Sequence, residues 1–139
     1  MSLSPLEWAV IAAIAGLAAM IGLVRLMPAA KPTARGKAEA EIAMLYRAVE
    51  AYRLDMFAYP TQAQGLQALV TMPPGLPHGD HYRKGGYIAR LPNDPWGYPY
   101  HYRIPGKRSQ FDIFSLGADG RPGGVGEDAD FGAWEIITS

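Results

Sequence analysis

Residues 115–132, SLGADGRPGGVGEDADFG, combine four carboxylates and six glycines in a segment with little to bury. Clustered carboxylates repel each other, and a glycine-rich loop loses much conformational entropy when it becomes ordered. A solvated, mobile loop would avoid both costs, whereas a bound cation would offset them. The chemistry that this segment suggests is therefore ion binding.

The oxygen donors of this acidic loop suit a hard cation. Calcium takes 6–8 oxygen ligands from carboxylates, backbone carbonyls and water. A glycine-rich arch would bring Asp119 on one arm towards Asp128 and Asp130 on the other. Leu116 would add a carbonyl oxygen, and residues 125–126 could supply another. The loop has no histidine and the chain no cysteine, which argues against zinc. These residues alone leave a calcium site and a solvated loop without an ion equally open.

Other binding and catalytic patterns fit the sequence poorly. The loop lacks the Lys-Ser/Thr pair of a phosphate-binding P-loop, and its carboxylates lack the spacing of an EF-hand. Ser115 has no plausible His–Asp partners, so we expect no catalytic residue. Asp94, in the turn PNDPWG, is expected to act either as a cap or as an acceptor of turn hydrogen bonds. The formal net charge of zero gives no reason to expect a nucleic-acid partner.

An uncharged segment, residues 8–24, lies near the N-terminus. Extended to Leu26 and Met27, it has the roughly 20 residues that a membrane-spanning helix needs. It is apolar on all sides, which favours a membrane helix over the core helix of a soluble domain. We expect a short segment at 1–7, a transmembrane helix at 8–27, and a domain at 28–139.

A second helix is predicted after this segment, either continuous with it or kinked near Pro28 and Pro32. A stripe of apolar residues spaced by three or four defines its buried face, and Tyr59-Pro60 would end it. The stripe consists of Ile42, Leu45, Val49, Tyr52 and Met56. Thr61 and Gln64 match a capping box, which predicts a short helix through about Val70.

The rest of the chain is rich in turns and predicts short strands. The four candidate strands are GYIARL (86–91), YPYHYRI (98–104), QFDIFSL (110–116) and AWEII (133–137). Together these elements predict an α+β fold, in which a long N-terminal helix packs through its amphipathic half on a small antiparallel sheet.

Three segments taken together resemble the major pseudopilin of the type II secretion system, within the type IV pilin-like superfamily. They are YRLDMFAYPTQAQGLQALV (52–70), GYIARLPNDPWGYPYHYRIPG (86–106) and the stretch from FDIFSLGADGRPGG (111–124) into the DADFGAW that follows. The resemblance extends over residues 3–134, nearly the whole chain. It implies a structural subunit, not an enzyme, that polymerises into a periplasmic pseudopilus and helps to move folded proteins across the outer membrane.

The resemblance also implies a cofactor and partners. The family binds Ca²⁺ in the acidic loop, which implies Asp119, Asp128 and Asp130 as side-chain ligands and Leu116 as a carbonyl ligand. The implied partners are further copies of this chain, minor pseudopilins, the inner-membrane assembly platform and the inner membrane itself. Glu7 corresponds to the family's assembly glutamate, which neutralises the N-terminal amine of a neighbouring subunit.

The N-terminus matches the family only in part. Residues 3–7 fit the start of a processed pseudopilin, but Ser2 replaces the glycine before the cleavage point and no basic leader precedes it. Cleavage and methylation by a prepilin peptidase therefore remain open alternatives to an unprocessed chain. Basic residues after the apolar segment would by themselves place the domain in the cytoplasm, whereas the resemblance implies a single-pass inner-membrane protein with a periplasmic domain.

Two other functions are compatible with parts of the sequence. A type IV pilin for adhesion or DNA uptake would share the fold, but neither a basic groove nor cysteines for an accessory disulfide are evident. A membrane-anchored hydrolase could use paired loop carboxylates, but so short a chain leaves little room for a substrate cleft.

Overall fold

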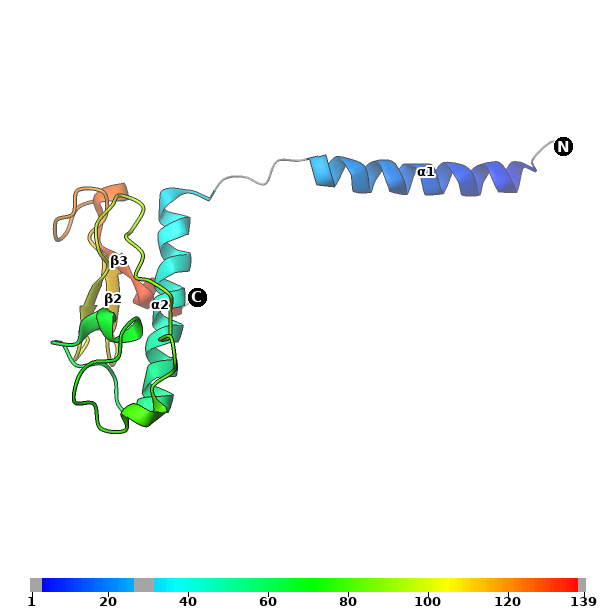
Figure 1. Ribbon diagram of the computed structural model, residues 1–139. Helices are drawn as coiled ribbons and strands as arrows, with labels where there is room; N and C mark the ends of the chain where they lie inside the picture. Colours follow the sequence, from blue (N-terminus) through cyan, green and yellow to red (C-terminus); the bar gives the residue numbers. More distant parts are fainter. Residues whose placement is uncertain (1–3, 27–31, 138–139) are drawn as a thin grey trace. The chain divides into compact units, whose positions relative to one another are not determined.

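The computed structural model describes residues 4–26 and 32–137, and the chain divides into an N-terminal unit and a globular unit, residues 32–139. In chain order the elements are α1 (Pro5–Leu26), α2 (Ala34–Met56), the 3-10 helices η1 (Gly65–Leu69) and η2 (Gly79–His81), β1 (His101–Arg103), β2 (Asp112–Ser115), the 3-10 helix η3 (Gly126–Asp128), β3 (Phe131–Gly132) and α3 (Ala133–Ile137). Figure 1 labels α1, α2, β2 and β3.

Helix α1 is apolar and is the one element described within its unit. Within the described parts of the chain it is the one helix long and apolar enough to cross a membrane, through the window Pro5–Gly22, and none of that window is buried. The helix begins at Pro5, so part of the expected short segment 1–7 is helical. Pro28 lies outside the described residues.

Helix α2 carries the predicted apolar stripe. Thr33 caps its N-terminus by accepting a hydrogen bond from the Gly36 amide at 3.1 Å. Every member of the stripe is buried, which confirms the predicted face. The helix ends at Met56, before Tyr59-Pro60, because Phe57 adopts a left-handed conformation with φ 59°.

The sheet has three antiparallel strands in the order β1-β2-β3. Two of the predicted strands contain β1 and β2, but two predictions are wrong. Residues 86–91 form no strand, because the amides of Tyr87 and Ile88 both donate to the Leu69 carbonyl and hold the segment against η1. Residues 133–137 form helix α3, and the third strand is the shorter β3 just before it.

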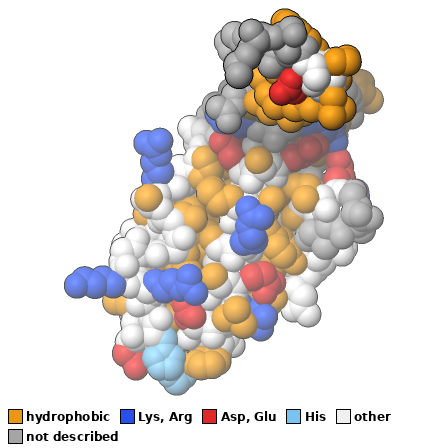
Figure 2. Space-filling model, turned by 90° about the vertical axis from the view of Figure 1, so that its right-hand side faces the viewer, with side chains coloured by type: hydrophobic (Ala, Val, Ile, Leu, Met, Phe, Trp, Pro, Cys, Tyr) orange, Lys and Arg blue, Asp and Glu red, His pale blue; other side chains and the backbone are white. Residues whose placement is uncertain are grey.

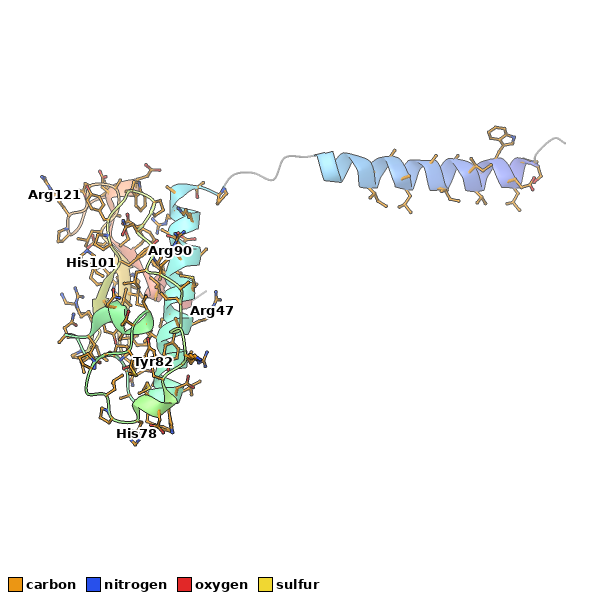
Figure 3. The ribbon with its side chains drawn as sticks, in the orientation of Figure 1. Arg47, His78, Tyr82, Arg90, His101 and Arg121 are labelled. Atoms are coloured by element: carbon orange, nitrogen blue, oxygen red, sulfur yellow. The ribbon has the colours of Figure 1, made fainter. Side chains whose placement is uncertain are left out.

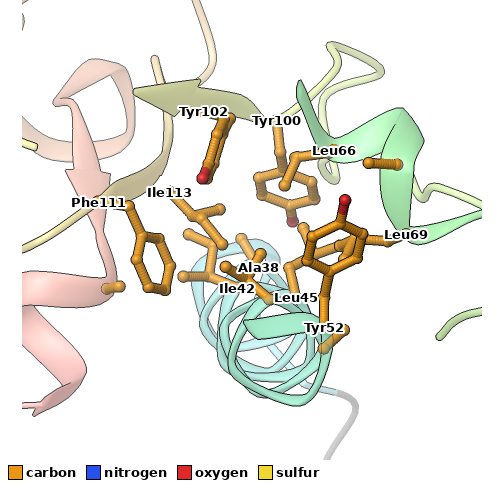
Figure 4. Packing of buried hydrophobic residues seen from close by; sticks show 14 of the residues in the cluster. Ala38, Ile42, Leu45, Tyr52, Leu66, Leu69, Tyr100, Tyr102, Phe111 and Ile113 are labelled. Carbon is orange, nitrogen blue, oxygen red and sulfur yellow. The ribbon is translucent and has the colours of Figure 1, made fainter. Parts of the chain in front are cut away.

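The core lies between α2, the sheet and η1 (Figure 4). Tyr100 and Tyr102 of the β1 region face α2, and their hydroxyls donate to Glu41 Oε2 at 2.6 Å and to the Pro60 carbonyl at 2.8 Å. Burial, with the Glu41 carboxylate nearby, raises the pKa of Tyr100 above its ordinary value. Among the residues whose burial is described, every buried hydrophobic residue lies between positions 38 and 133, so the globular unit has a core of its own.

Candidate functional site

The acidic loop connects two neighbouring strands. It leaves β2 at Ser115 and returns at Phe131 of β3, and these residues are partners in the sheet register. Farther out, the Ala118 amide donates to the Glu127 carbonyl at 2.8 Å, and other backbone bonds follow towards the tip. Antiparallel pairing therefore brings the two arms of the loop side by side, as the sequence predicted for a folded arch.

Gly117 allows the arms to approach closely. It has φ 76°, a left-handed conformation that favours glycine, and a Cβ atom there would lie 2.6 Å from the carbonyl carbon of Asp128. A side chain at this position would force the arms apart. Gly117 is therefore required for the close contact between the two arms next to the strands.

Asp94 fastens the first arm of the loop to the turn PNDPWG. The carboxylate is 4% exposed, and its Oδ1 accepts hydrogen bonds from the amides of Trp96 and Tyr98 at 3.2 and 2.8 Å. Its Oδ2 accepts from Ser115 Oγ at 2.6 Å, and the same Oγ accepts from the Gly117 amide at 3.1 Å. The expected role of Asp94 in the turn is confirmed, and the structure adds the link to the acidic loop.

Replacing Asp94 with alanine is expected to destabilise the globular unit strongly. The change leaves the buried Ser115 hydroxyl and two turn amides without their acceptor, which should cost roughly 3 kcal/mol of unfolding free energy. Urea unfolding of residues 32–139 measures this change. Asp80→Ala is the matched control, because its side chain is 79% exposed and should change stability by less than about 0.5 kcal/mol. Equal effects in the two variants would contradict the fastening role.

The structure places the four predicted ligands on both arms of the loop. Asp119 is exposed, and its Oδ1 accepts a hydrogen bond from the Arg121 amide at 3.0 Å. Asp128 is exposed in η3, while Leu116 and Asp130 are half-buried. The Oδ1 atom of Asp130 is buried and has no hydrogen-bond partner within the described residues. A buried carboxylate oxygen without a partner is unfavourable, so this atom is suited to receiving a cation.

The side chains are not yet gathered around one point. Within residues 4–26 and 32–137, no three His, Cys, Asp or Glu side chains lie close enough together to hold a metal. The loop has the donor types that calcium takes, namely carboxylates on both arms, backbone carbonyls between them and an unpartnered oxygen on Asp130.

Glu7 lies in the first turn of α1, apart from the acidic loop in the sequence. The Ser4 amide donates to Glu7 Oε2 at 2.7 Å, and the Glu7 amide donates to Ser4 Oγ at 3.4 Å. This is a reciprocal capping box, followed by Pro5 at the first helical position. The spacing of Ser4 and Glu7 is the signal from which this capping role could have been predicted, although no cap was expected there.

Comparison with known proteins relates most of the chain to one family. Residues 25–134 match the family described as "Type II secretion system (T2SS), protein G". The type II secretion system core protein G of Pseudomonas aeruginosa is 42% identical over 130 residues, covering 94% of this chain and 92% of that protein. The protein of the same name from Vibrio cholerae is 45% identical over 131 residues, covering 94% and 89% of the two chains.

A solved structure extends the similarity to the fold. The crystal structure of the major pseudopilin from the type 2 secretion system of enterohaemorrhagic Escherichia coli superposes with a TM-score of 0.63 at 46% sequence identity. The match covers 73% of this chain and 87% of that one. With its apolar N-terminal helix and small antiparallel sheet, the chain belongs to the protein G family of type II secretion systems, the major pseudopilins.

Proposed function

We propose that this pseudopilin polymerises through α1 and that the resulting pseudopilus drives folded proteins across the outer membrane. Membership of the family makes the chain a structural subunit of the pseudopilus rather than an enzyme. The observation that supports polymerisation through α1 is the contrast between the two units. Helix α1 has its apolar side chains exposed along the described part of its length, whereas the globular unit buries its own core. Packing of α1 against the same helix of other copies would remove that surface from water.

The proposed location follows from the same helix. One apolar helix is consistent with a single-pass membrane anchor, and we place it in the inner membrane with residues 32–139 in the periplasm. Assembly into a pseudopilus involves other secretion components. We propose minor pseudopilins and the inner-membrane assembly platform as these partners, together with further copies of this chain.

We further propose that the acidic loop binds one calcium ion. Asp119, Asp128 and Asp130 would supply carboxylate oxygens and Leu116 its backbone carbonyl. The unpartnered Oδ1 of Asp130 and the contact between the arms support this assignment. When bound, calcium would neutralise the carboxylates and join the end of β2 to the start of β3. Magnesium would substitute poorly because it demands a smaller octahedral shell.

Secretion by a host whose own major pseudopilin is deleted tests the proposed function and the role of Glu7 together. We expect the wild-type chain to restore filaments and secretion. Glu7→Gln should reduce filament yield by roughly tenfold or more, because it leaves a neighbour's amine unpaired in a membrane environment, at a cost of about 2.5–3.5 kcal/mol. Electron microscopy of sheared filaments and assay of the secreted protein measure both effects.

The amide variant separates charge from helix capping. Glutamine can still accept the hydrogen bond from the Ser4 amide, so Glu7→Gln should keep the start of α1 helical, whereas Glu7→Ala also removes the cap. Wild-type filament yield with Glu7→Gln and reduced yield with Glu7→Ala would assign Glu7 to capping alone. Absence of filaments from the wild-type chain would contradict the proposed function itself.

A further inference from the structure

A cavity of about 450 Å³ opens beside the acidic loop on the sheet side of the globular unit. Its volume lies in the range of small-ligand sites. Cationic and aromatic side chains dominate its lining: His101, Arg103, Lys107, Arg108, Phe114 and Trp134. Figure 3 shows His101 on this side of the unit and Arg47 on the opposite side, next to α2. The proposed binding of calcium by the acidic loop gives no role to these cationic side chains.

Aromatic rings hold the two arginines and the histidine in place. The His101 ring stacks on Phe114 with centroids 5.2 Å apart, and the Arg103 guanidinium carbon lies 4.8 Å from the same ring. The Arg108 guanidinium carbon lies 4.7 Å from the Trp134 ring. A guanidinium over an aromatic face keeps the N–H donors at its edge available. These arginines are therefore oriented in advance and able to bind an anion.

The turn that carries Lys107 and Arg108 is fixed by a buried carboxylate. Asp112 is 1% exposed, and its Oδ2 and Oδ1 accept from the amides of Lys107 and Arg108 at 2.6 and 3.4 Å. Gly106 permits this close turn, since a Cβ atom there would lie 2.4 Å from the Ser109 carbonyl oxygen. The cationic side of the cavity is thus built on the core rather than on a loose loop.

Positive charge exceeds negative charge in the cavity. Arg103 lies 3.8 Å from Asp112, but none of the ion pairs among the described residues involves Lys107 or Arg108. Even with Asp130 counted, three permanent cations face two carboxylates. The cavity therefore has at least one positive charge to offer a ligand.

We propose that this cavity binds an acidic peptide segment, through a carboxylate next to an apolar side chain. Arginine forks match carboxylates, and the aromatic rings offer apolar area that a bare inorganic anion would leave unused. A nucleic acid would need a wide basic surface, but the whole chain has zero net charge. The face formed by α2 carries cationic and anionic side chains interspersed (Figure 2). The cavity itself has room for a few side chains only.

Titration calorimetry on the full-length chain in neutral detergent tests the proposal, with a capped Glu-Glu-Phe-Glu-Glu peptide as probe at low ionic strength. Arg108→Glu should weaken peptide binding by roughly tenfold or more, and Arg108→Lys should weaken it less, since it keeps the charge but loses the planar fork. Arg47→Glu is the matched control, because this exposed cation lies on the other side of the unit and should leave binding unchanged.

The outcomes separate the alternatives. Tight peptide binding that Arg108→Glu removes and excess inorganic phosphate does not displace would support an acidic-peptide site. Displacement by phosphate at equal concentration would mean a general anion site and overturn the proposal. An equal loss of peptide affinity in Arg47→Glu would also overturn the proposal. So would unchanged peptide affinity in both Arg108→Lys and Arg108→Glu. Filament formation is not part of the measurement, so its result is independent of the proposed function.

Discussion

Removal of residues 1–31 is expected to abolish filaments completely and to leave a soluble, folded monomer. None of residues 4–22, the part of the deleted segment whose burial is described, belongs to the core, whose described members lie between positions 38 and 133. The deleted segment does contain large exposed apolar side chains, for example Leu6, Trp8 and Met20, at 74%, 61% and 68% exposure. Each is worth about 1.5–3 kcal/mol when fully buried against a neighbouring subunit. Sedimentation velocity and electron microscopy measure the loss of assembly.

The same truncation should leave the stability of the globular unit intact. We expect residues 32–139 to unfold cooperatively and at the same temperature as the globular unit of the full chain in detergent. A truncated chain that still forms filaments would contradict assembly through α1. A truncated chain without a cooperative transition would contradict the independent core.

Calcium is expected to raise the melting temperature of residues 32–139 by roughly 10 °C. An ion that binds only the folded state stabilises it by about 2.7 kcal/mol when free calcium is a hundred times the dissociation constant. In a domain of this size, that free energy corresponds to roughly 10 °C. Asp119→Ala and Asp130→Asn should each remove most of this response, because each deletes a proposed carboxylate ligand. Thermal unfolding of each variant, in chelator and in added calcium, measures this shift in melting temperature.

The control for this prediction is Asp80→Ala, which removes an exposed carboxylate far from the acidic loop in the sequence and should keep the full calcium response. Magnesium at the same concentration should raise the melting temperature much less. If Asp119→Ala responds like the wild-type unit, Asp119 is not a ligand. We also expect Asp119→Ala to reduce filament yield and secretion, through the weaker subunit.

The buried face of α2 could be predicted because the apolar residues of an amphipathic helix recur at the helical period. Ile42, Leu45 and Val49 recur at the helical period, and all three are fully buried. The Thr61–Gln64 box was predictable for the same local reason, and its reciprocal hydrogen bonds are present at 2.9 and 3.2 Å. The helix that follows is a short 3-10 segment, a distinction that the apolar spacing does not make.

The C-terminal segment was mispredicted because a five-residue, mostly apolar segment fits a strand and a helix equally well. In the structure Ala133 is buried and Ile136 partly buried, a spacing of three that places both on one helical face. Arg35 of α2 pairs with Glu135 and ties this short helix to α2. These tertiary contacts decide the conformation, and a window of five residues does not contain them.

The arrangement of the candidate site was only partly predictable. The sequence placed the acidic residues on two arms, but the fastening of Ser115 by Asp94 joins positions 21 apart and leaves no local pattern. The cationic cavity depends likewise on β1, the turn after it and α3 meeting beside the loop. Long-range pairings of this kind follow from the topology of the sheet and not from local propensity.

The most direct test of the calcium site is the number of ions bound by residues 32–139. Titration calorimetry from a calcium-free starting state should give one calcium per chain, with binding lost in Asp130→Asn and much weaker heats for magnesium. That result would explain why carboxylates and glycines share one loop. A wild-type unit that binds no calcium would contradict the calcium site and identify residues 115–132 as a solvated acidic loop. Equal binding of calcium and magnesium, unaffected by Asp130→Asn, would also contradict the proposed site.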